Sequence, residues 1–99
     1  MRRGTTPTNT FGSDTDLREA EVIYITYRQA GKTIIERELP DITVTKETLE
    51  VTLTQEETLR FNSQQKVEIQ VRAKFPGSQA IASNIVETTV GRILKDGEI

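Results

Sequence analysis

The sequence lacks cysteine and histidine, and each absence excludes a class of function. Without cysteine the chain forms no disulfide and has no thiolate nucleophile. Without histidine it also lacks the usual zinc sites and the side chain that most readily transfers protons near neutral pH. We therefore expect a protein that is not an enzyme, with no catalytic residues, no cofactor and no metal ion.

Net charge and long apolar runs are also scarce. Thirteen basic and fifteen acidic residues leave a charge of -2, too weak a field to attract nucleic acid or an anionic membrane. The longest strongly apolar run, residues 22–27, is far shorter than the ~20 residues of a membrane helix. No apolar stretch follows Arg2 and Arg3, so we expect no signal peptide. Nucleic acid, membranes and small-molecule substrates are therefore not expected partners.

Threonine is abundant, with fifteen residues among ninety-nine, and β-branched residues favour strands. Apolar and polar residues alternate over 66–75 and again over 48–54, as in strands with one buried face. Residues 22–27 are apolar on both faces, which predicts a central strand. We expect one shared core to contain the two alternating faces, Val67, Ile69 and Val71 with Leu49, Val51 and Leu53.

Turn residues predict three hairpins. Gln29-Ala30-Gly31 is predicted to form a three-residue loop between strands 22–27 and 33–39. A turn through Lys46 and Glu47 should join strand 42–45 to strand 48–54. Pro76-Gly77 is predicted to form a type II turn between strand 66–75 and a last strand over residues 80–90.

One segment departs from the β pattern. Thr54 and Glu57 have the spacing of a capping box, which predicts one or two helical turns over residues 55–61. Short strands, tight turns and a single helical turn together predict an all-β, immunoglobulin-like antiparallel sandwich of about seven strands.

The ends of the chain are predicted to differ from this domain. Residues 1–19 are polar except for Phe11 and Leu17 and are predicted to form an N-terminal arm or an edge strand. Residues 20–94 should form the β-sandwich domain, and residues 95–99 a frayed tail. If residues 1–13 are an assembly arm, deleting residues 2–10 should leave melting nearly unchanged.

Several residues are candidates for contact with other proteins. A threonine-rich arm with a proline suits strand addition at a sheet edge, and its candidate interface residues are Thr5, Pro7, Thr8 and Phe11. Tyr24 and Tyr27 should point to opposite faces of their strand, so at least one is a further interface candidate. The acidic cluster of Asp14, Asp16 and Glu19 lacks the glycine and final glutamate of a calcium loop, and we interpret it as a solvated turn.

Five segments of the sequence are similar to those of a known group of proteins. They are residues 3–8 (Arg-Gly-Thr-Thr-Pro-Thr), 53–59, 67–72, 82–85 (Ala-Ser-Asn-Ile) and 90–97 (Val-Gly-Arg-Ile-Leu-Lys-Asp-Gly). These segments resemble small uncharacterised proteins of phages and prophages in Gram-positive bacteria, and the similarity runs through nearly the whole chain. Such proteins look like structural components of the tail or baseplate. The family offers no catalytic residues.

The resemblance implies a function in assembly. It implies a structural or adaptor module that is made in the host cytoplasm, becomes part of the virion, and docks onto copies of itself or onto other tail proteins. The alternative is a carbohydrate-binding sandwich that helps to recognise the host. That function requires exposed aromatic side chains that converge on a concave face, and the chain has only five aromatic residues.

Overall fold

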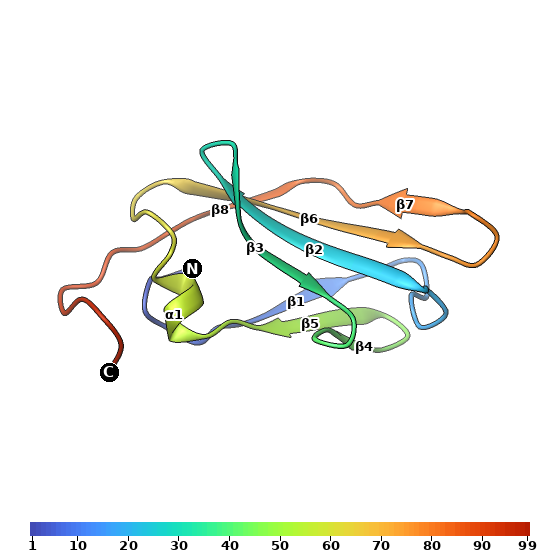
Figure 1. Cartoon of the computed structure of the whole chain (residues 1–99), viewed down its shortest axis with the longest axis horizontal. Coiled ribbons are helices and arrows are strands. Elements are labelled where there is room, and N and C mark those ends of the chain that lie inside the picture. Colours follow the sequence, from blue (N-terminus) through green and yellow to red (C-terminus); the bar gives the residue numbers. More distant parts are fainter.

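The computed structural model describes residues 1–99 as two antiparallel sheets stacked face to face (Figure 1). Its elements are β1 (Thr8–Gly12), β2 (Val22–Gln29), β3 (Lys32–Glu38), β4 (Thr43–Val44), β5 (Thr48–Thr52), α1 (Gln55–Thr58), β6 (Lys66–Lys74), β7 (Ala80–Ala82) and β8 (Val86–Thr89). One sheet has the order β1-β5-β4, and the other has the order β3-β2-β6-β7, with β8 also paired to β6. The predicted all-β antiparallel sandwich is confirmed.

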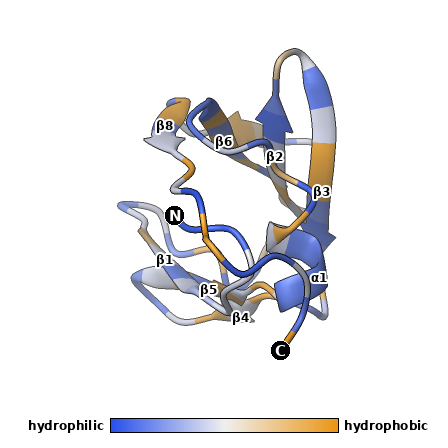
Figure 2. Ribbon diagram, turned by 90° about the vertical axis from the view of Figure 1, so that its left-hand side faces the viewer, coloured by the Kyte–Doolittle hydropathy of each residue, from blue (hydrophilic) through white to orange (hydrophobic).

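The core lies between the two layers, which Figure 2 shows from one end. Sixteen buried apolar residues form a single cluster, because every second side chain of the long strands points inward. The cluster contains both predicted faces, those of residues 67–71 and of residues 49–53, so their placement in one core is confirmed. Strand β2 lies between β3 and β6, as its apolar character on both faces predicted.

The three hairpins form, but two of their turns differ from the prediction. Gln29 pairs with Lys32, so the first loop contains two residues and not three. Ala30 and Gly31 both have positive φ, 51° and 77°, as a type I′ turn requires. In the third hairpin, Gly77 has the predicted positive φ, but Ser78 has one as well, so the connection is wider than a type II turn.

The predicted last strand, residues 80–90, is divided into β7 and β8. Both pair with β6, but the register shifts by one residue between Ala82 and Val86. At the break, the Ser83 hydroxyl accepts a hydrogen bond from the Val71 N–H at 3.0 Å, in place of a regular ladder bond. The side chain thus stabilises a bulge-like irregularity, and the sandwich has eight strands where about seven were predicted.

Helix α1 has the predicted capping box but ends at Thr58, three residues earlier than predicted. The Thr54 hydroxyl accepts from the Glu57 N–H, and the Glu57 carboxylate accepts from the Thr54 N–H. After Thr58, bonds from Arg60 to Glu57 and from Phe61 to Thr58 tighten the chain into a turn. No helix of this structure is long and apolar enough to span a membrane.

The N-terminal residues belong to the folded domain. Met1 to Arg3 run parallel to Gly91, with which they exchange two backbone hydrogen bonds. The chain then crosses at Gly4, which has a φ of +70° and lies so close to Ile93 that a Cβ atom would stand 2.9 Å from its Cδ1. It reaches the other sheet as β1, which is an edge strand. Of the two alternatives predicted for residues 1–19, an arm or an edge strand, the structure has the edge strand.

The C-terminal tail, residues 95–99, is exposed but lies along α1 in the structure (Figure 1). The Ile99 N–H donates to the Gln55 side-chain oxygen at 2.9 Å, and Asp96 accepts from Arg3 at 3.2 Å. The prediction of a frayed tail did not include these polar contacts, because their partners are far away in the sequence. Ile99 itself remains 94% exposed.

Candidate functional site

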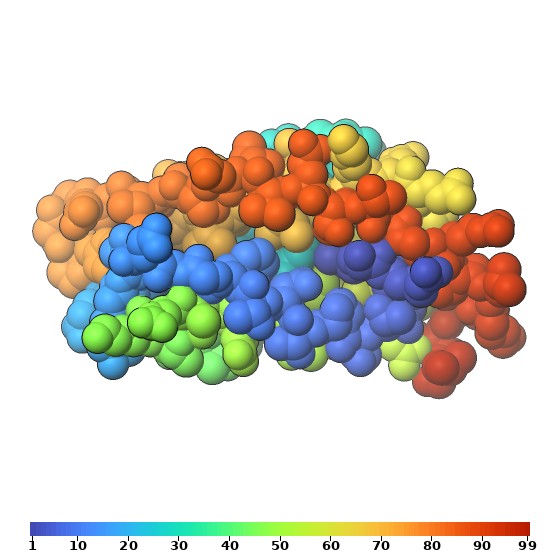
Figure 3. Space-filling model, turned by 180° about the vertical axis from the view of Figure 1, so that it is seen from behind, coloured from blue at the N-terminus to red at the C-terminus, as the bar shows by residue number.

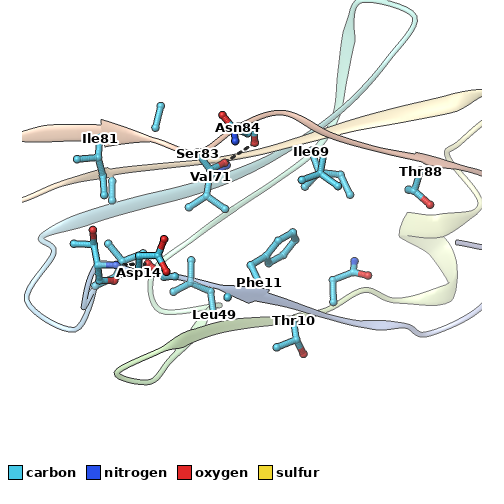
Figure 4. Close-up of a pocket in the computed structure, with 18 of the residues that line it drawn as sticks. Thr10, Phe11, Asp14, Leu49, Ile69, Val71, Ile81, Ser83, Asn84 and Thr88 are labelled. Carbon is cyan, nitrogen blue, oxygen red and sulfur yellow. Dashed lines mark hydrogen bonds between the residues drawn. The ribbon is translucent and has the colours of Figure 1, made fainter.

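A groove runs along one side of the sandwich, between β1 and the β7–β8 edge, and has a volume of about 860 Å³. Figure 3 shows these two borders from the side on which the groove opens. In Figure 4, Ile69 and Val71 point from one sheet toward Leu49 and Phe11 of the other. Asp14 is the only residue with a charged side chain among the twenty that line the groove. The groove therefore has an apolar floor and an almost uncharged wall.

The groove exists because the two sheets end differently on their two sides. On the β3–β4 side, a short loop joins the sheets and Arg37 reaches from β3 to Glu57 of α1. On the opposite side, β1 and the β7–β8 edge belong to different sheets and have no ladder between them. The N-terminal crossing beside Gly91 links these edges only at one end. The rest of this side stays open.

The outer edge of β1 has free backbone groups. The Leu53 N–H donates to Pro7, and the Ser13 N–H donates to Glu47, which fixes the alternation of the antiparallel ladder. Asn9 and Phe11 therefore direct their N–H and C=O groups toward β5. The residues between and beside them, Thr8, Thr10 and Gly12, direct theirs away from β5, and none of these groups has a hydrogen-bond partner.

This edge has none of the features that usually protect sheet edges. Strand β1 contains no charged residue and no proline, and it pairs regularly over five residues. The other edge strands are shorter or charged: β3 carries four charged residues, β4 has only two residues, β7 has three, and β8 has four, one of them charged. Charges and short length are common means of preventing edge-to-edge pairing. Strand β1 is thus the edge best able to accept another strand.

Two of the predicted interface residues hold the chain's own fold together. The Thr5 N–H donates to the Thr58 hydroxyl at 3.1 Å, and that hydroxyl donates to the Thr5 C=O at 2.9 Å. The Pro7 C=O accepts from the Leu53 N–H at 3.0 Å. Their backbones are therefore occupied inside the molecule and are not free for strand addition. Thr8 and Phe11, in contrast, line the groove.

The two tyrosines point to opposite faces of β2, as predicted, but only one can contact another molecule. Tyr27 is fully buried, and its hydroxyl accepts a hydrogen bond from the Asn9 amide at 2.8 Å. Burial raises the pKa of Tyr27, and the bond from Asn9 offsets part of that effect. The proposal of Tyr27 as an interface residue is therefore wrong, because a central strand buries one of its two faces. Tyr24 is 38% exposed but does not line the groove.

The groove floor was not predicted as a site. Ile69, Val71 and Leu49 were correctly assigned to the core from their alternation, but alternation says only which face is buried. It carries no information on whether the edge beside that face is covered. Ile81 and Ala82 on the far rim gave no signal beyond membership in the last strand.

A second polar feature joins Arg37 to Glu57. Both guanidinium nitrogens of the Arg37 fork donate to the Glu57 carboxylate, and one also reaches the Thr52 C=O. Burial acts to raise the pKa of Glu57, but the hydrogen bonds from Arg37 and from the Thr54 backbone outweigh it, so this pKa is lowered. All these groups are satisfied within the chain, and we interpret the pair as a clamp between β3 and α1.

The acidic cluster is partly engaged in its own turn. The Asp16 carboxylate accepts from the Arg18 guanidinium at 2.7 Å, and this hydrogen bond lowers the pKa of Asp16 to about 2. The structure contains no group of three acidic or other ligating side chains placed to hold a metal ion.

Comparisons with known proteins found a similarity at the level of structure alone. No family model and no curated protein matches this sequence. Among solved structures, the V domain of amphioxus IgVJ-C2 is similar, with 14% sequence identity over 94% of this chain and 97% of that chain, and a TM-score of 0.39.

Proposed function

We propose that this protein is a non-enzymatic structural or adaptor module that acts by binding other proteins, in the phage tail or baseplate that the sequence resemblance implies. The observation that carries the proposal is the uncharged, unpaired edge of β1 beside an apolar groove. Such an edge binds polypeptide more readily than any other class of ligand, because strand addition satisfies its free N–H and C=O groups.

The polar features of the molecule agree with a role in assembly. The Arg37–Glu57 pair is used inside the fold, and no buried side-chain polar atom lacks a hydrogen-bond partner. A catalytic site usually contains titratable groups whose pKa values are shifted and which face a cleft. The groove contains a single carboxylate, Asp14, and no second titratable side chain beside it.

No observation favours the carbohydrate-binding alternative. Sugar sites commonly use exposed aromatic rings that converge on a concave surface. Here Tyr27 and Phe61 pack against each other in the core, with ring centroids 6.3 Å apart. Phe11 is the only aromatic residue in the groove, and Tyr24 lies outside it.

The proposal is tested in particles. A tagged chain is produced in a bacterial host during phage growth, the particles are purified on a density gradient, and their proteins are quantified by mass spectrometry. We expect the chain at a fixed ratio to the tail proteins. The control is the variant Ile69→Asp, which should not fold and should be absent. If the wild-type chain stays in the soluble lysate, the proposed function is wrong.

A further inference from the structure

We propose that the groove binds an extended, uncharged segment of a partner protein, which joins the three-stranded sheet as an antiparallel strand beside β1. The proposal rests on the proposed function, because it names the contact through which assembly would occur. Two separate features of the structure carry it: the free backbone groups of β1 and the apolar floor of the groove.

The backbone defines where the partner's residues lie. Thr8, Thr10 and Gly12 each direct one N–H and one C=O away from β5. In an antiparallel ladder, residues opposite these three exchange both hydrogen bonds with them. The five residues of β1 provide an edge about 17 Å long, so a segment of five to seven residues is sufficient. We choose the antiparallel direction because every ladder between strands here is antiparallel.

The side chains of the partner strand must alternate between groove and solvent. Partner residues opposite Asn9 and Phe11 share their face, and both of these side chains point toward the core. Such residues enter the groove above Ile69 and Val71, which line its floor. Partner residues opposite Thr8, Thr10 and Gly12 face solvent, as those three do. The ligand is therefore a strand with apolar side chains at every second position.

The near absence of charge in the groove disfavours charged ligands, and its free backbone groups disfavour compact ones. Asp14 lies at one end of β1 and is the only charged side chain in the lining, so a charged residue inserted at the centre would lose water without gaining a counterion. A compact ligand would fill the apolar floor but leave the three outward N–H groups of β1 unsatisfied. An extended uncharged segment satisfies both features at once.

The binding test uses the whole chain and a capped nine-residue peptide, in which valine alternates with serine between two terminal lysines. The variant Thr10→Pro removes one outward N–H without disturbing a bond inside the sheet, because proline is tolerated at edges. We expect it to weaken binding by about tenfold or more. The matched control Thr10→Val keeps the N–H and loses only the hydroxyl, so it should bind within about threefold of wild type. Circular dichroism melting checks that both variants fold.

Two modified peptides test the register without altering the protein. In the antiparallel strand with valines in the groove, the serine N–H groups face β1 and the valine N–H groups face away. N-methylation of the serines should therefore abolish binding, whereas N-methylation of the valines should leave it within about threefold of the parent peptide. The opposite result, equal effects, or no binding of the parent peptide would overturn the proposal.

Three further outcomes decide between this inference, the proposed function and a second copy as the occupant. If wild type and Thr10→Pro enter particles equally, the β1 contact is wrong while the function in assembly stands. If wild type is absent from particles, the proposed function is wrong, and the peptide data alone decide whether the groove binds a strand. If the chain alone forms a dimer in sedimentation that Thr10→Pro abolishes, a second copy occupies this edge, and the proposed partner strand is wrong.

Discussion

The hydrogen bond between Asn9 and Tyr27 ties the edge strand β1 to the central strand β2 of the other sheet, and its loss should be measurable. The Asn9 amide donates to the Tyr27 hydroxyl at 2.8 Å, and the tyrosine is fully buried. In Tyr27→Phe, the amide lies at the groove and can still bind water, so only the net bond is lost, about 1 kcal/mol. In Asn9→Ala, the buried hydroxyl keeps no partner, which costs about 2 kcal/mol.

The double variant separates this bond from other effects. Once the hydroxyl is gone, Asn9→Ala leaves nothing unsatisfied and adds almost no cost, so the pair together should cost about 1 kcal/mol and not 3, a coupling energy of about 2 kcal/mol. For a chain of this length, each kcal/mol lowers the melting temperature by roughly 4–8 °C. Urea unfolding followed by circular dichroism gives the free energies. Strictly additive costs, or no cost for Asn9→Ala, would refute the docking of β1 onto β2.

Three further predictions concern stability. Ile69→Asp buries an unpaired carboxylate in the core and should remove several kcal/mol, enough to unfold the domain, as judged by circular dichroism. Because the pKa of folded Glu57 is lowered from 4.5, its stabilisation should be complete above that pH and be lost as pH falls through the folded value; Glu57→Gln should remove this part of the pH dependence in urea titrations. Deletion of residues 2–10 should lower the melting temperature by roughly 10 °C or more, because it removes the bonds made by Thr5 and Asn9; unchanged melting would restore the mobile arm.

Regular alternation made much of the fold predictable. Over residues 66–75 and 48–54, side-chain period alone identified two strands and the shared core. The capping box of Thr54 and Glu57 was equally local, because both of its bonds lie within four residues. The end of α1 was not, since nothing in the sequence distinguishes a second helical turn from the tighter turn that forms.

The features that were not predicted from the sequence depend on residues far apart in the chain. The break between β7 and β8 is stabilised by a bond between Ser83 and Val71, and the buried hydroxyl of Tyr27 has its hydrogen-bond partner in Asn9, eighteen residues earlier. The groove depends even less on local sequence. It exists because two sheets end at β1 and at the β7–β8 edge without a strand between them, and no residue pattern marks a neighbour that is missing.

Amide hydrogen exchange, measured by NMR on the free chain, tests most directly the claim that β1 is an integral strand with an open edge. We predict alternating protection, with slow exchange at Asn9, Phe11 and Ser13 and fast exchange at Thr8, Thr10 and Gly12. Adding the valine–serine peptide should slow the second group alone. Uniformly fast exchange would show that β1 is a mobile arm, and uniformly slow exchange would show that its edge is already covered; either result would contradict the account.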